Sequence, residues 1–86
     1  MDLKIENLKK KIIYRSNYRG TREMDKLLSS FVISVIDSLN MRELEDLLNF
    51  LGLDDDSLYK YNQGLMKSLP IKENNITALF KKYKYK

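Results

Sequence analysis

Apolar residues recur along most of the chain at spacings of three and four positions, the spacing of one face of an α-helix. The longest such stripe predicts a helix over residues 21–39. This stretch does not show the strict alternation of apolar and polar residues that a half-buried β-strand requires. The positions of the stripe are Met24, Leu27, Leu28, Phe31, Val32, Val35, Ile36 and Leu39.

Shorter stripes of the same kind lie on both sides of this helix. They predict helices over about residues 3–16, 41–51, 56–63 and 72–83. Gly20, Gly52 and Gly64 fall between the predicted helices, and we expect Gly20 to take the left-handed conformation that often follows a helix end. The chain is thus predicted to be all-α, a compact bundle of four to five short helices that forms a single domain over residues 1–86.

Three of the predicted helices begin with a recognisable cap. Thr21 is a suitable N-cap for the long helix, and Asn40 followed by Glu43 has the spacing of a capping box. The run Asp54, Asp55 and Asp56 suits a helix start, because acidic side chains cap the first turn and favour its dipole. The same run could hold Ca²⁺ or Mg²⁺, but it lacks the ligand spacing of an EF-hand loop. Capping is therefore the favoured interpretation.

The composition excludes several classes of chemistry. The 86 residues include no Cys and no His, so a disulfide framework, a thiolate zinc site, a Cys nucleophile and a His general base are all ruled out. No apolar run approaches the ~20 residues needed to span a bilayer. We therefore expect a cytoplasmic protein that is not an enzyme, has no membrane insertion and carries no metal or cofactor of its own.

The net charge of +4 is unevenly distributed. Residues 1–26 hold eight basic and four acidic side chains, residues 37–58 one basic and seven acidic, and residues 59–86 seven basic and one acidic. The favoured interpretation is that the acidic middle attracts the basic ends within the fold. The alternative is a bipolar docking surface that orients a partner.

The C-terminal segment 80–86 alternates aromatic residues with lysines, as a site for single-stranded nucleic acid can. The simpler interpretation is that Phe80 and Tyr83 face the core while the lysines are solvated. A small basic nucleic-acid-binding module is retained as an alternative function.

The end of the first predicted helix concentrates aromatic and arginine side chains around one glycine and one carboxylate. Tyr and Arg are enriched at interface hot spots, and Arg can hold a carboxylate or phosphate by two contacts. Glu23 either contacts a partner or pairs with Arg19 or Arg22 and fixes the helix junction. The cluster consists of Tyr14, Arg15, Tyr18, Arg19, Gly20, Arg22 and Glu23.

The sequence around this cluster resembles that of a known family. Residues 19–25 match the Arg-Gly-x-x-Glu signature, followed by an apolar residue and Asp, of the succinate dehydrogenase flavinylation factors (the SdhE family). Residues 53–61 resemble the family's acidic pair and the aromatic helix that follows it, with Tyr61 where members usually have Trp. The resemblance covers about residues 8–82.

The resemblance implies an assembly factor that promotes covalent attachment of FAD to a histidine of the flavoprotein subunit of succinate dehydrogenase, or of fumarate reductase. The factor would be a monomer when free and would hold that subunit in a reactive arrangement, without a nucleophile of its own. Some members of the family have also been interpreted as antitoxin-like interaction modules. The resemblance places the partner contact at Arg19, Gly20 and Glu23, and further candidates are Arg15, Tyr18, Arg22, Asp54, Asp55 and Tyr61.

Overall fold

A computed structural model of the chain describes residues 3–84, which form five α-helices and one short 3₁₀ helix, η1. The predicted all-α architecture is confirmed, and the Cα radius of gyration of 12.2 Å is that of a compact chain of this length. The elements are α1 (Leu3–Ser16), α2 (Arg22–Val35), η1 (Ile36–Ser38), α3 (Met41–Phe50), α4 (Asp55–Asn62) and α5 (Asn75–Lys82).

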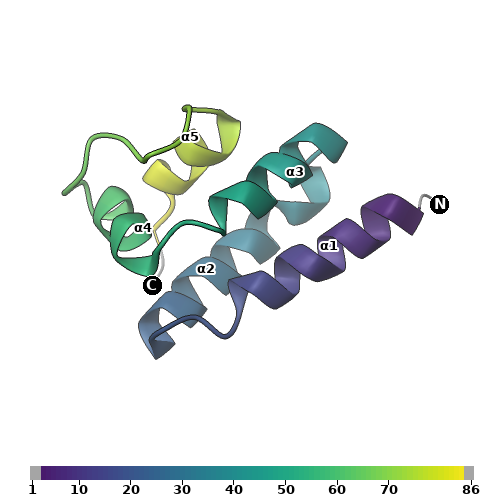
Figure 1. The fold of residues 1–86 in the computed structure, drawn as a ribbon, viewed down its shortest axis with the longest axis horizontal. Coiled ribbons are helices and arrows are strands. Elements are labelled where there is room, and N and C mark those ends of the chain that lie inside the picture. Colours follow the sequence, from purple (N-terminus) through teal and green to yellow (C-terminus); the bar gives the residue numbers. More distant parts are fainter. Residues whose placement is uncertain (1–2, 85–86) are drawn as a thin grey trace.

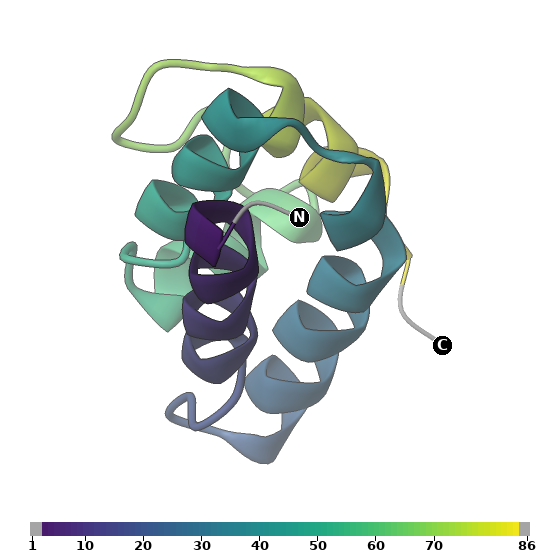
Figure 2. The same cartoon turned by 90° about the vertical axis from the view of Figure 1, so that its right-hand side faces the viewer.

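The first three α-helices pack together, and the last two cover one end of them (Figure 1). α1 packs against both α2 and α3, while α5 packs against α3 and α4. Figure 2 shows α1 and α2 side by side, joined by a short loop at one end of the molecule. The arginines predicted to be functional lie in this α1–α2 loop and in the helix ends beside it.

Three buried phenylalanines form the centre of the core. Phe31 of α2, Phe50 of α3 and Phe80 of α5 are each fully buried. Their ring centroids lie 5.0 to 6.1 Å apart in tilted or edge-to-face arrangements, which are favourable for aromatic pairs. Tyr83 adds an edge-to-face contact 5.4 Å from Phe31. The aromatic residues at 80 and 83 therefore pack inward, as the simpler interpretation of the C-terminal segment predicts, and Tyr85 and Lys86 lie outside the described residues.

The predicted helix over 21–39 ends earlier than its apolar stripe. The α-helix stops at Val35, and the next turn is η1. The hydroxyl groups of Ser34 and Ser38 donate to carbonyl oxygens three residues earlier, at 2.6 and 2.8 Å. Such bonds compete with the backbone pattern of an α-helix. Ile36 is nevertheless buried, and Leu39 packs against the core, so the stripe identified the buried face correctly.

The last helix also begins later than predicted, at Asn75 rather than residue 72. Asn74 is its N-cap, and its side chain accepts from the backbone N–H of Thr77 while the Thr77 hydroxyl accepts from the backbone N–H of Asn74. This reciprocal pair fixes the start of the helix. The caps at Thr21 and Asn40 are present as predicted. Within residues 3–84, no helix is both long enough and apolar enough to span a bilayer.

Candidate functional site

The loop between α1 and α2 turns sharply at Tyr18. Tyr18 has φ 58°, while Gly64 is the only glycine with positive φ among the described residues. The prediction that Gly20 would take the left-handed conformation is therefore wrong. The C-terminal turn of α1 is closed by Ser16 and Asn17, whose side chains both donate to the carbonyl of Ile13 at 2.8 Å. The chain reverses at once after this turn.

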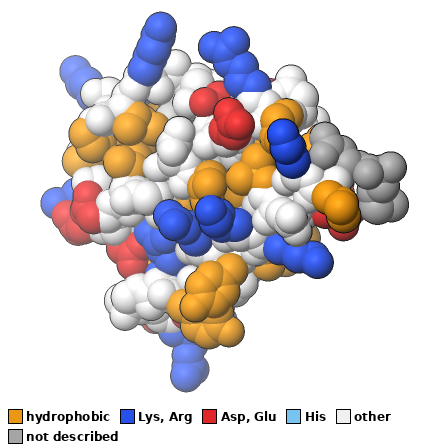
Figure 3. Space-filling view, turned by 45° about the vertical axis from the view of Figure 1, so that its right-hand side comes forward, with side chains coloured by type: hydrophobic (Ala, Val, Ile, Leu, Met, Phe, Trp, Pro, Cys, Tyr) orange, Lys and Arg blue, Asp and Glu red, His pale blue; other side chains and the backbone are white. Residues whose placement is uncertain are grey.

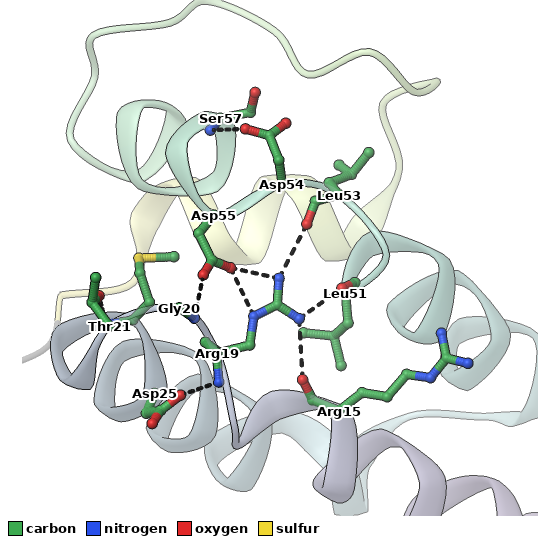
Figure 4. Close-up of polar contacts among 11 residues, drawn as sticks. Arg15, Arg19, Gly20, Thr21, Asp25, Leu51, Leu53, Asp54, Asp55 and Ser57 are labelled. Carbon is green, nitrogen blue, oxygen red and sulfur yellow. Dashed lines mark hydrogen bonds and ion pairs between the residues drawn. The ribbon is translucent and has the colours of Figure 1, made fainter.

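The side chain of Arg19 points into the molecule rather than toward solvent (Figure 4). Its guanidinium lies 2.7 to 2.8 Å from Oδ1 of Asp55. The same group donates to the backbone carbonyl oxygens of Leu51, Leu53 and Arg15 at 2.8, 3.1 and 3.1 Å. Only 12% of the Arg19 side chain is exposed. Arg19 thus ties the α1–α2 loop to the connection between α3 and α4.

Gly20 lies against the same carboxylate. Its N–H donates to Oδ2 of Asp55 at 2.8 Å, so Asp55 binds the Arg19 guanidinium with one oxygen and the loop backbone with the other. A Cβ atom at position 20 would lie 3.1 Å from Oδ2. The side chain of Asp25 also accepts a hydrogen bond from the backbone N–H of Arg19. Glycine is favoured at position 20 because of this close approach. We call Arg19, Gly20 and Asp55 the junction lock.

The three consecutive acids at the start of α4 have three separate partners. Asp54 is the N-cap and accepts from the N–H of Ser57 at 3.0 Å, and hydrogen bonds from the backbone and hydroxyl of Ser57 lower the pKa of Asp54 from its ordinary value of 3.8. Asp55 belongs to the junction lock, and Asp56 pairs with Lys60 one turn later at 3.1 Å. No group of three or more potential metal ligands is found in residues 3–84. Capping and ion pairing account for these acids.

Glu23 is not part of the junction lock. It is exposed in the first turn of α2. Among the described residues its carboxylate has no hydrogen-bond or ion-pair partner. The alternative in which Glu23 pairs locally with Arg19 or Arg22 is therefore not what the structure shows. Arg15 and Arg22 are exposed as well.

Two exposed tyrosines lie near the end of α1, one in the helix and one in the loop that follows it. Tyr14 and Tyr18 are 66% and 79% exposed, and their ring centroids lie 5.2 Å apart. Two neighbouring aromatic rings in solvent, next to exposed arginines, have the composition of an interface hot spot. We call the exposed side chains of Tyr14, Arg15, Tyr18, Arg22 and Glu23 the outer corner.

Tyr61 does not belong to this surface. It is only 2% exposed, and the Nζ of Lys81 lies 5.8 Å from the centre of its ring. The structure therefore places Tyr61 in the core beneath α5. Of the residues singled out in the sequence, Arg19, Gly20 and Asp55 are brought together in the junction lock, whereas Asp54 caps α4 without touching them.

One feature that the sequence did not indicate is a pocket beside Glu23. It has a volume of about 250 Å³ and lies between α2, the C-terminal half of α4 and the end of the described chain. Its walls come from three separate segments, so no local sequence pattern could have predicted it. The lining residues are Glu23, Leu27, Tyr59, Asn62, Gln63 and Lys84.

The basic side chains do not form a continuous stripe on the face shown in Figure 3. They lie at several separate places there, with apolar and acidic side chains between them. Ion pairs instead link the N-terminal basic block to the acidic middle: Arg19 pairs with Asp55, and Lys9 pairs with Asp37 at 3.3 Å. This agrees with the interpretation that the charge blocks attract one another within the fold.

Comparison with known proteins agrees with the resemblance seen in the sequence. Residues 10–84 match the family described as the flavinator of succinate dehydrogenase. The FAD assembly factor SdhE of Acetobacter pasteurianus is 31% identical over 74 residues, which are 86% of this chain and 65% of that protein. The chain thus spans slightly less than two thirds of this relative's length. No solved structure matches significantly. The chain belongs to the family of flavinators of succinate dehydrogenase.

Proposed function

We propose that this protein is an assembly factor that binds the flavoprotein subunit of succinate dehydrogenase and promotes covalent attachment of FAD to it. The observation that carries the proposal is the family match over residues 10–84. The name of the Acetobacter relative, an FAD assembly factor, supports the same function. A flavoprotein subunit of fumarate reductase is a second partner of the same class.

The outer corner is the surface that we assign to the partner. Its Glu23 carboxylate and the Arg15 and Arg22 guanidinium groups are exposed, and none of these three side chains has a partner within residues 3–84. Charged groups of this kind can bind complementary groups of a second protein without first breaking internal bonds. Arg19 and Gly20 contribute indirectly, because the junction lock uses their hydrogen-bonding groups.

The mechanism is one of orientation. The chain has no His and no Cys, and the resemblance assigns the reacting histidine to the partner. FAD, bound by the partner, is the group that becomes attached. Holding two reacting groups in the productive arrangement can lower a barrier by several kcal/mol without any chemical group from the factor. The role of this chain is to bind and position, and we place that role in the cytoplasm.

Co-expression with the flavoprotein subunit tests this proposal. The subunit is expressed alone, with this protein and with its Glu23→Ala form, and covalent flavin is read as in-gel fluorescence after denaturation. We expect fluorescence to rise with the wild-type protein and to fall with Glu23→Ala to the level of the subunit alone. Glu73→Ala is the matched control, because Glu73 is an exposed carboxylate in the loop before α5. Equal fluorescence in all lanes would refute the proposed function.

Circular dichroism of the Glu23→Ala protein separates a binding defect from a folding defect. Because Glu23 has no partner among the described residues, its removal should leave helix content and melting temperature close to those of the wild type. An unfolded Glu23→Ala protein would instead mean that this carboxylate maintains the helix junction.

A further inference from the structure

The pocket beside Glu23 has the size of a site for one long side chain. Its volume of about 250 Å³ is below the roughly 300–1,000 Å³ typical of sites for whole small-molecule ligands. Its position next to the outer corner places it where a bound partner would reach it.

The polar groups of the pocket include acceptors on Glu23 and Asn62 and donors on Gln63 and Lys84. Both N–H groups of the Asn62 amide are used, since its nitrogen donates to the carbonyl oxygens of Phe80 and Tyr83 at 2.9 Å. Its oxygen already accepts from Nε2 of Gln63 at 2.9 Å and retains a second lone pair. The Glu23 carboxylate is an acceptor as well. An occupant with several donors can bind the acceptors of Glu23 and Asn62.

The apolar part of the pocket suits a long stem and a flat head group. Leu27 is only 6% exposed and forms an apolar wall. Tyr59 is 46% exposed, so its ring can receive a planar cation on its face. An arginine side chain combines these properties: it has five N–H donors, no acceptor, an aliphatic stem and a head group that stacks on aromatic rings. The ammonium of Lys84 also lines the pocket and repels a cationic occupant, so the Glu23 carboxylate has to offset this repulsion.

We propose that this pocket receives one arginine side chain of the flavoprotein subunit, with its guanidinium on Glu23 and its stem between Leu27 and Tyr59. The inference rests on the proposed function, because it names the group that the outer corner binds. It adds Tyr59, on a different helix, to the residues that recognise the partner. Lysine and neutral side chains are the competing occupants.

A titration of the isolated protein tests the chemistry of the pocket without the partner. The probe is N-acetyl-arginine amide, and N-acetyl-citrulline amide is a neutral probe of nearly the same shape. Nitrogen–proton correlation spectra should show saturable shifts at Leu27, Tyr59 and the Asn62 side-chain amide with the arginine probe alone. The shifts should disappear in Glu23→Gln. Equal shifts with the citrulline probe, with N-acetyl-lysine amide or in Glu23→Gln, or no saturable shift with any probe, would overturn the inference.

Binding to the flavoprotein subunit tests the same pocket in the complex. Tyr59→Leu should weaken binding by about tenfold, the effect expected of an aromatic contact at an interface, and Tyr59→Phe should lose much less because it keeps the ring. Leu65→Ala is the control, since Leu65 is 72% exposed in the loop after α4. Unchanged binding of Tyr59→Leu would overturn the arginine site.

The two proposals fail in different ways. If the wild-type protein neither binds the flavoprotein subunit nor raises its covalent flavin, the proposed function is wrong. If Glu23→Ala abolishes flavin attachment while Tyr59→Leu does not weaken binding, the function holds and the arginine pocket is wrong.

Discussion

The junction lock makes a quantitative prediction about Arg19. Its side chain is 12% exposed and that of Asp55 is 27% exposed. The free energy that this ion pair contributes to stability should therefore lie between the values for exposed and for fully buried pairs. Exposed pairs contribute about 0–1 kcal/mol, whereas removing one partner of a fully buried pair costs about 3–5 kcal/mol. The guanidinium also donates to three backbone carbonyl groups. We therefore expect Arg19→Ala to destabilise the fold by about 2–3 kcal/mol.

A double-mutant cycle separates the ion pair from the other bonds of Arg19. Asp55→Asn removes the charge but leaves an acceptor, and we expect it to cost about 1–2 kcal/mol. Because the two side chains share one contact, the double variant should be less destabilised than the sum of the single variants, by about 1 kcal/mol or more. Urea unfolding followed by circular dichroism measures each value. At about 4–8 °C per kcal/mol for a domain of this size, Arg19→Ala should melt about 10–20 °C lower.

The result also decides what Arg19 does in the complex. If Arg19→Ala costs less than about 0.5 kcal/mol and shows no coupling to Asp55, then the lock is not a stabilising unit. If that stable variant also fails to bind the flavoprotein subunit, Arg19 is a direct partner contact and our assignment of it to the interior is refuted.

Three further predictions concern neighbouring positions. Gly20→Ala should lower the free energy of unfolding by about 0.5–1.5 kcal/mol in urea unfolding, because the new Cβ would lie 3.1 Å from the Asp55 carboxylate. Unchanged stability would mean that the Asp55 side chain can move away from this Cβ without cost. Tyr18→Gly should raise or maintain the melting temperature, since φ 58° is unstrained for glycine, yet it should weaken binding of the flavoprotein subunit. Asp54→Asn should make the free energy of unfolding fall less steeply with decreasing pH in the acid range, as measured by urea unfolding at several pH values. Hydrogen bonds from Ser57 lower the Asp54 pKa below 3.8, so the stabilisation is present above pH 3.8 and is lost as the pH falls through the folded-state pKa.

The helices could be predicted because their signals are local. Thr21, Asn40 and Asp54 each cap a helix whose apolar stripe begins within a few residues. The start of α5 was misplaced because its cap, Asn74, pairs with Thr77 rather than with the Glu or Gln of the usual capping box. The apolar stripe alone sets a helix boundary only to within a few residues.

The roles within the Arg-Gly-x-x-Glu motif could not be predicted from the sequence. Arg19 and Asp55 are 36 residues apart in the chain, and no periodicity relates them. The resemblance assigns the partner contact to Arg19, Gly20 and Glu23 alike. In the structure the first two bind the chain itself, and only Glu23 faces outward without a partner among the described residues. The five-residue motif thus contains both residues that bind within the chain and a carboxylate that is exposed to solvent.

These two halves of the motif are physically connected. The lock joins the start of α2 to Asp55, the first residue of α4. One turn further along each helix lie Leu27 and Tyr59, which both line the pocket beside Glu23. Because the lock fixes the distance between the two helix starts, it also sets the separation of the pocket walls. Loss of Arg19 should therefore weaken recognition of an arginine side chain even in the molecules that remain folded. Titration of Arg19→Ala with N-acetyl-arginine amide, at a temperature well below its melting point, measures this effect apart from stability.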